Sequence, residues 1–233
     1  MTKIIITIIV LAIIGFGVWA VVSNDSLMNG NNGQNATSTD DAIAQDATGA
    51  SSIEGSGTYV ATASSSMMWE GRKILVPGYT DQGVINIKNG SLVLADGNIA
   101  SGTFEIDMTT IAVESTGRGS GESNLTTHLK SDDFFDVAKY PTAKFTINSA
   151  TPLGGSSFEV KGDLTLKGIT QPIAFIANIT QEDNMIVANA ETELDRTLWD
   201  VRYGSGKFFD DLGDNIIGDT FKVTFNLVTE MSS

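Results

Sequence analysis

Residues 158–167 read FEVKGDLTLK, and their alternation decides the fold class of this chain. In an extended strand, Phe158, Val160, Gly162, Leu164 and Leu166 share one face, and the charged or polar residues between them share the other. One face therefore packs on a hydrophobic core and the other meets water. This division is typical of an antiparallel sheet, because a parallel sheet is covered by helices on both faces.

The same period of two recurs on both sides of this segment. Apolar and polar residues alternate at 103–108, 145–147, 173–179, 186–194 and 221–227. The pairs Asn89-Gly90 and Asp96-Gly97 and residues 181–184 are predicted to form hairpin turns between strands. Seven or eight such strands must bury their apolar faces, either against a second sheet or by closing into a barrel. Alternation alone does not choose between the two.

One short helix is predicted at residues 123–130. Ser123 or Asn124 is available as its N-cap, and Leu125 and Leu129 lie one turn apart on the same side. Pro141 disfavours helical geometry in the residue before it and so prepares the next strand, at 143–150.

Two stretches carry a family resemblance: HLKSDDFFDVAKYPTAKF at 128–145 and GDLTLKGITQPI at 162–173. Together they resemble the signature of the YceI-like family, lipocalin-like barrels of the bacterial envelope that bind amphiphilic, polyisoprenoid-type lipids. The resemblance runs from about Gly57 to the C-terminus. It implies an all-β, antiparallel lipocalin-like barrel of about eight strands with one short helix, and a homodimer. Many relatives have a V-x-F-x-V-x-H-like first strand, whereas residues 67–83 here contain no His.

Residues 4–22 form an uncharged apolar run of 19 residues. As a helix this run spans about 28 Å, enough to cross the hydrocarbon core of a bilayer. Lys3 precedes the run and the next basic residue is Arg72, so we expect a cytoplasmic N-terminus and a domain outside the cytoplasm, periplasmic or at the cell surface. A cleaved signal peptide is the alternative.

We therefore expect a transmembrane anchor at 1–22, a disordered linker at 23–57 and the barrel domain at 58–233. Between Ser23 and Gly57 the chain has no Lys or Arg and only four large apolar residues, Leu27, Met28, Ile43 and Ile53. Such a composition does not build a hydrophobic core.

Composition excludes several classes of function. The chain has 14 Lys and Arg against 28 Asp and Glu, a net charge of −14. Nucleic acid is therefore not an expected partner, and anionic membranes should repel the folded part. Cysteine is absent, so disulfides, thiolate metal sites and Cys nucleophiles are excluded. The acidic run at 210–219 does not match the calcium-loop spacing, and we expect no metal and no cofactor.

The predicted ligand site is the inner face of the barrel. Large residues alternate there with small ones, so the lumen either holds a slender apolar ligand or is filled by side chains that interdigitate. The resemblance favours the ligand. The predicted ligand-binding residues are Phe104, Ile106, Met108, Phe145, Phe158, Leu164, Phe175, Ala177, Ala188, Ala190 and Phe225, with His128 and Arg196 at the mouth.

Each mouth residue has a second interpretation. His128, the only His, is either a head-group contact or a surface or capping residue beside Asp132 and Asp133. Arg196 either pairs with a carboxylate at the rim or meets a head group. Phe134 and Phe135 are predicted to plug one end of the barrel.

The leading hypothesis is a membrane-tethered binding protein that is not an enzyme, because no nucleophile elbow, triad or phosphate-binding loop occurs. The alternatives are a fully packed barrel that serves as an envelope interaction module, and an enzyme acting on a lipid head group through His128.

Overall fold

The computed structural model describes residues 53–232. The chain divides into two units, Met1–Ala44 and Gln45–Ser233, and the described residues belong to the second. The predicted anchor and most of the predicted linker lie outside the described residues. Within 53–232, no helix is both long enough and apolar enough to span a bilayer.

The described residues form nine strands, one α-helix and two short 3-10 helices, and the strands form one antiparallel sheet. Their bounds are β1 Gly57–Ala61, β2 Ser66–Arg72, β3 Thr80–Ala95, β4 Asn98–Ser115, α1 Glu122–Lys130, β5 Thr142–Gly154, β6 Ser157–Leu166, β7 Ile169–Glu182, β8 Met185–Asp195, η1 Arg196–Trp199, η2 Gly213–Asn215 and β9 Thr220–Met231.

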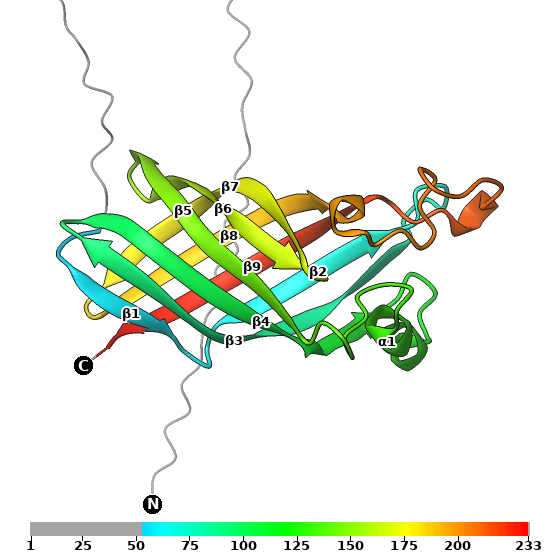
Figure 1. Ribbon diagram of the computed structural model, residues 1–233, viewed down its shortest axis with the longest axis horizontal. Coiled ribbons are helices and arrows are strands. Elements are labelled where there is room, and N and C mark those ends of the chain that lie inside the picture. Colours follow the sequence, from blue (N-terminus) through cyan, green and yellow to red (C-terminus); the bar gives the residue numbers. More distant parts are fainter. Residues whose placement is uncertain (1–52, 233) are drawn as a thin grey trace, which may run out of the picture. The chain divides into compact units, whose positions relative to one another are not determined.

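The sheet closes on itself because β1 and β2 share one position in it. Both strands pair with β3 on one side and with β9 on the other, β1 near Leu92 and Thr229 and β2 near Ile85 and Phe225. They therefore lie end to end as one interrupted stave, and nine strands occupy eight positions around a barrel (Figure 1). The prediction of an antiparallel barrel with one helix is confirmed.

The two ends of the barrel differ. We call one the hairpin end, since it carries the turns β3–β4, β5–β6 and β7–β8. We call the other the loop end: it carries the longer connections at 73–79, 116–141 and 196–219, together with α1 (Figure 1).

One predicted turn is wrong and another is confirmed. Asn89 and Gly90 lie inside β3, where the pairing with β4 shifts register between Ile87 and Asn89. Gly90 is needed there for packing, because a Cβ would stand 2.2 Å from the Phe104 ring. The chain turns instead at Asp96-Gly97, where both residues have positive φ, 50° and 72°. Such angles suit a two-residue hairpin turn.

Helix α1 begins one residue earlier than predicted and is capped differently. Its N-cap is Gly121 in a left-handed conformation (φ 97°), and no side chain makes a capping hydrogen bond. Ser123 and Asn124 lie inside the first turn. A left-handed entry favours glycine, which has no Cβ to clash, over the predicted polar caps. Leu129 is buried at the centre of the contact with the barrel.

The two stretches that carry the family resemblance pack against each other. A Cβ on Gly162 of β6 would lie 2.3 Å from the Thr146 carbonyl oxygen and 2.6 Å from the Phe145 ring. A Cβ on Gly168, in the β6–β7 turn, would lie 2.8 Å from the Tyr140 ring. The glycines of one stretch are therefore the surfaces on which the aromatic rings of the other rest.

The folded domain begins earlier than the predicted boundary at residue 58. Ile53 is 2% exposed and packs in the core of the hairpin end with Tyr59, Leu94 and Ile99. The Gly97 amide donates to the Gly55 carbonyl (2.8 Å), so residues just before β1 close this end of the barrel.

We predict that Gly162→Ala lowers the free energy of unfolding by about 1–3 kcal/mol, the usual cost of overpacking, because its Cβ meets backbone. Urea denaturation measures this loss. Gly71→Ala is the matched control: Gly71 is also a strand glycine, and a Cβ there meets nothing within 4 Å. Equal stabilities of the two variants would contradict the packing role of Gly162.

Candidate functional site

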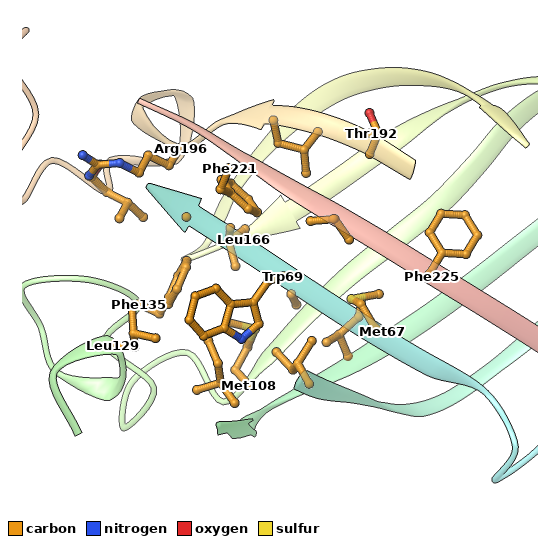
Figure 2. Close-up of a pocket in the computed structure, with 18 of the residues that line it drawn as sticks. Met67, Trp69, Met108, Leu129, Phe135, Leu166, Thr192, Arg196, Phe221 and Phe225 are labelled. Atoms are coloured by element: carbon orange, nitrogen blue, oxygen red, sulfur yellow. The ribbon is translucent and has the colours of Figure 1, made fainter. Parts of the chain in front are cut away.

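The barrel encloses a cavity of about 580 Å³ that runs from the middle of the lumen to the loop end. This volume falls within the range of roughly 300–1,000 Å³ that ligand sites occupy. The wall is mostly apolar along the lumen, and Arg196 lies at the loop end (Figure 2). The lining also includes Arg72, Lys73, Asp81, Arg118 and His128.

Inward-facing aromatic residues show that the lumen is hollow. Phe145, Phe175 and Phe225 lie on β5, β7 and β9 with ring centroids 5.7 and 5.5 Å apart, and all three line the cavity. They are only partly buried, although they point into a closed barrel. At the hairpin end, by contrast, Tyr59 and Phe158 are each 1% exposed. The hairpin end is therefore closed by fully buried side chains, whereas the middle is hollow, and the cavity reaches Leu92, Ile99 and Ile179 of the hairpin-end core.

Small residues on neighbouring strands make room for this cavity. Ala177 on β7 is paired with Ala190 on β8, and Ala188 lies two residues before Ala190. Ala143, with a short side chain, and Gly71, with none, also line the cavity. The alanines that line the cavity among the phenylalanines leave space that larger side chains would fill.

Eleven of the thirteen predicted site residues line the cavity: Phe104, Ile106, Met108, Phe145, Leu164, Phe175, Ala177, Ala188, Phe225, His128 and Arg196. Phe158 and Ala190 do not. Phe158 belongs to the packed hairpin end, and Ala190 is covered within the wall, 8% exposed between its partners Ala177 and Phe225.

The sequence analysis missed the contribution of β2. Met67 and Trp69 point into the lumen from this strand (Figure 2), whereas Met68 between them is 44% exposed. The alternation of Met67, Trp69 and Gly71 was a usable signal, but the outward Met68 obscured it. The lining also includes Ile85, Leu92, Ile99, Leu129, Phe134, Phe135, Leu166, Ile173, Thr192, Phe221 and Val223.

Arg196 holds the long β8–β9 connection in place. Its side chain is 5% exposed and donates from Nε to the Gly218 carbonyl (2.9 Å), from Nη1 to Val201 (2.8 Å) and from Nη2 to Ile217 (3.2 Å). Asp219 lies at 3.9 Å. The pairing with a carboxylate, one of its two predicted roles, is present through Asp219, but backbone carbonyls engage most of the guanidinium.

His128 joins α1 to the β8–β9 connection. Its Nε2 lies 3.1 Å from Asp133 Oδ2. Its ring meets Phe134 and Tyr203 edge-on, at centroid distances of 4.9 and 4.5 Å. These contacts form one side of the opening. Phe134 and Phe135, which were predicted to plug one end of the barrel, both line the cavity at this end.

The opening carries more positive than negative side chains, in contrast to the chain as a whole. Arg72, Lys73, Arg118 and Arg196 border the cavity with one carboxylate, Asp81. Asp81 Oδ1 accepts a hydrogen bond from the Gly117 amide (3.0 Å). Burial raises the pKa of Asp81, although that hydrogen bond and the nearby Lys73 and Arg118 act in the opposite direction.

Among residues 53–232, no group of three or more His, Asp or Glu side chains is placed to hold a metal ion. Most of the acidic run at 210–219 is exposed, and it leads into β9 through the short helix η2.

We predict that Arg196→Lys lowers the free energy of unfolding by about 2–4 kcal/mol, because a single ammonium does not replace a planar group bonded to three carbonyls. It should also increase protease cleavage within 200–218. Arg202→Lys is the control, because Arg202 is exposed and pairs with Asp200, and such surface pairs contribute little. Equal losses of unfolding free energy in the two variants would contradict the role of Arg196 in holding the β8–β9 connection.

The raised pKa of Asp81 predicts a pH-dependent effect of Asp81→Asn. Because its pKa is raised by folding, the Asp81 carboxyl is protonated more readily in the folded state than in the unfolded state. Its ionisation therefore lowers the stability of the folded state at pH values above the folded pKa, and this loss is absent below the unfolded pKa of about 3.9. The stability of the variant minus that of the wild type should therefore be larger at pH 7 than at pH 3.5. Urea denaturation at both pH values measures this difference, and a pH-independent difference would contradict the assignment.

Comparison with known proteins places this architecture. Residues 59–229 match the family model of the YceI-like domain. A UPF0312 protein of Shewanella denitrificans is 31% identical over 100 residues, 43% of this chain and 50% of the relative. One of Pseudomonas putida is 35% identical over 89 residues, 37% and 46% of the two chains. The chain thus spans about half the length of the curated relatives it matches.

Two solved structures share the fold. BcnA of Burkholderia cenocepacia aligns with a TM-score of 0.57 at 22% identity, covering 71% of this chain and 96% of BcnA. A polyisoprenoid binding domain from Saccharophagus degradans aligns with a TM-score of 0.55 at 14% identity, covering 76% of this chain and all of that domain. With a family match over most of its length and the barrel described above, this chain belongs to the YceI-like family.

Proposed function

We propose that this protein binds an amphiphilic, polyisoprenoid-type lipid in the barrel lumen, and that residues 1–22 tether it to a membrane with the barrel outside the cytoplasm. The observation that carries the proposal is the hollow apolar lumen, closed at the hairpin end and open at the loop end. A similar fold in a domain described as polyisoprenoid binding supports it.

The energetics favour a ligand with a long apolar tail. Each methylene removed from water contributes about 0.8 kcal/mol, and a chain-like ligand makes this gain along the whole slot. The partly buried rings of Phe145, Phe175 and Phe225 would lose their remaining accessible surface against such a tail.

The polar groups at the opening suit a head group. Lys73 and Arg118 lie near Asp81 on two loops at the mouth, and His128 lies on α1. The lumen itself is lined almost throughout by apolar side chains, so the tail would enter first and the head would remain at the opening. We propose the same orientation for any ligand of this class.

Two other functions are less well supported. A fully packed barrel acting as an interaction module is difficult to reconcile with a cavity of about 580 Å³. An enzyme acting on the head group would use His128, whose contacts are Asp133 and two aromatic rings. It predicts loss of turnover in His128→Ala, whereas binding predicts little change in lipid retention.

Ala188→Phe tests the lumen. Ala188 lines the cavity and is 6% exposed, so a phenyl ring there would occupy the slot. We predict that the wild-type barrel, purified from a lipid-containing host, carries lipid detectable by native mass spectrometry, and that Ala188→Phe carries at least tenfold less.

Ile176→Phe is the matched control, because Ile176 on β7 is 50% exposed on the outer face. It should retain lipid at the wild-type level. A wild-type barrel without bound lipid, or an Ala188→Phe variant that retains lipid, would contradict the proposal that the lumen binds lipid. Circular dichroism and urea denaturation exclude misfolding as the cause of any loss.

A further inference from the structure

The loop end carries an exposed apolar surface beside the opening of the cavity. Besides Leu198 of η1, five of the eleven exposed large hydrophobic residues in the described part of the chain lie there, on two loops, with exposed fractions of 43–58%. We call these five residues the apolar rim: Ile74, Leu75, Tyr203, Phe208 and Phe209.

The two loops are joined to each other and to the opening. The Ile74 amide donates to the Ile216 carbonyl (3.3 Å), and the Gly218 amide donates to the Arg72 carbonyl (2.8 Å). Lys73 and Tyr203, which neighbour or belong to the rim, line the cavity. The two loops that carry the apolar rim are therefore bonded to each other and border the mouth. Figure 1 shows these two connections together at the loop end.

We propose that the apolar rim docks on a lipid bilayer, so that the lumen takes up or delivers its ligand at the membrane surface. This inference rests on the proposed function, since a lipid with a long tail crosses water only at a cost of about 0.8 kcal/mol per methylene. If the mouth contacts the bilayer, the ligand passes between membrane and lumen without crossing water.

The chemistry of the rim fits the interfacial region of a bilayer. Aromatic side chains favour the membrane–water interface, where an apolar ring and polar neighbours are both accommodated. The guanidinium carbon of Arg202 lies 4.8 Å from the centroid of the Phe208 ring, and Lys207 directly precedes Phe208 in the chain. Arg202 is paired with Asp200, and Lys207 with Asp195 and Asp219. These side chains therefore add polar groups rather than unpaired positive charge next to the apolar contacts.

The charge balance selects neutral lipid over anionic lipid. Residues 200–218 contain Arg202 and Lys207 but four Asp residues, a net charge of −2. Residues 72–79 contain Arg72 and Lys73 and no acid, so the two loops together have no net charge, while the whole chain has −14. Docking must therefore be driven by apolar contact, and added anionic lipid should weaken it.

The chain is long enough for the mouth to reach the membrane that residues 4–22 are expected to cross. Residue 53 joins the barrel at the hairpin end, opposite the rim. The longest strand, β4, has 18 residues and spans at most about 60 Å. Fully extended, the 30 residues from 23 to 52 reach about 100 Å.

The test uses the barrel alone, as a chain starting at residue 45, so that the predicted anchor does not bind vesicles. Every described strand is paired on both sides, and all buried core residues lie within 53–229, so the part tested contains the whole barrel and its core. We expect it to cosediment with phosphatidylcholine vesicles, and to do so less when phosphatidylglycerol is added. Phe208→Ser with Phe209→Ser, or Ile74→Ser with Leu75→Ser, should weaken binding about tenfold or more.

Leu153→Ser with Ile176→Ser is the matched control, because these residues are equally exposed, at 56% and 50%, but lie away from the mouth. It should bind as the wild type does. Failure of the wild type to bind vesicles while it still carries lipid would overturn the rim inference and leave the proposed function standing. Vesicle binding by a barrel that carries no lipid would support the rim and overturn the function.

Sedimentation velocity tests whether the apolar rim contacts a second copy of the chain instead of a bilayer. If the wild type is dimeric and does not bind vesicles, and the rim variants are monomeric, the rim is a dimer surface and membrane docking is overturned.

Discussion

The pairing of β9 with both β1 and β2 is the constraint on which the rest of the structure depends. It converts a sheet with two edges into a barrel without an edge, and so every strand's apolar face is directed into one enclosed space. An eight-position barrel is just wide enough to be filled by side chains or to hold one slender ligand. Here the hairpin end is filled, with Tyr59, Phe158 and Ile186 almost fully buried, and the rest of the lumen is not.

The two ends of the barrel have different structural roles. At the hairpin end, short turns and Ile53 complete a packed core that stabilises the closed sheet. At the loop end, α1, the β2–β3 loop and the β8–β9 connection surround an opening, and Arg196 ties that connection to the barrel through three carbonyls. Charge is distributed in the same way: cationic side chains border the mouth of a strongly acidic chain. A closed end with a buried core and an open end bordered by loops are what the proposed binding of an apolar tail requires.

The family signature acquires a physical meaning in this structure. The Phe145 ring packs on Gly162, and the Tyr140 ring packs on Gly168. The two sequence stretches of the signature occur together because they pack against each other, and this packing involves no catalytic group. The same argument explains the error at Asn89-Gly90. That pair has the composition of a hairpin turn, but Gly90 is required by the Phe104 ring across the β3–β4 ladder, a contact that no local pattern reveals.

Alternation by itself determined that this chain is an antiparallel β protein and which side chains point inward, because the two faces of a strand follow directly from the order of residues. Most of the predicted lining residues could be named for that reason. Only the tertiary structure decided whether the inward residues fill the barrel. Phe158 and Phe145 have the same local pattern, yet one is packed at the closed end and the other faces a cavity. The role of Arg196 was also beyond the sequence, since its partners are backbone carbonyls 5 to 22 residues away that meet it only when the β8–β9 connection folds back on the barrel.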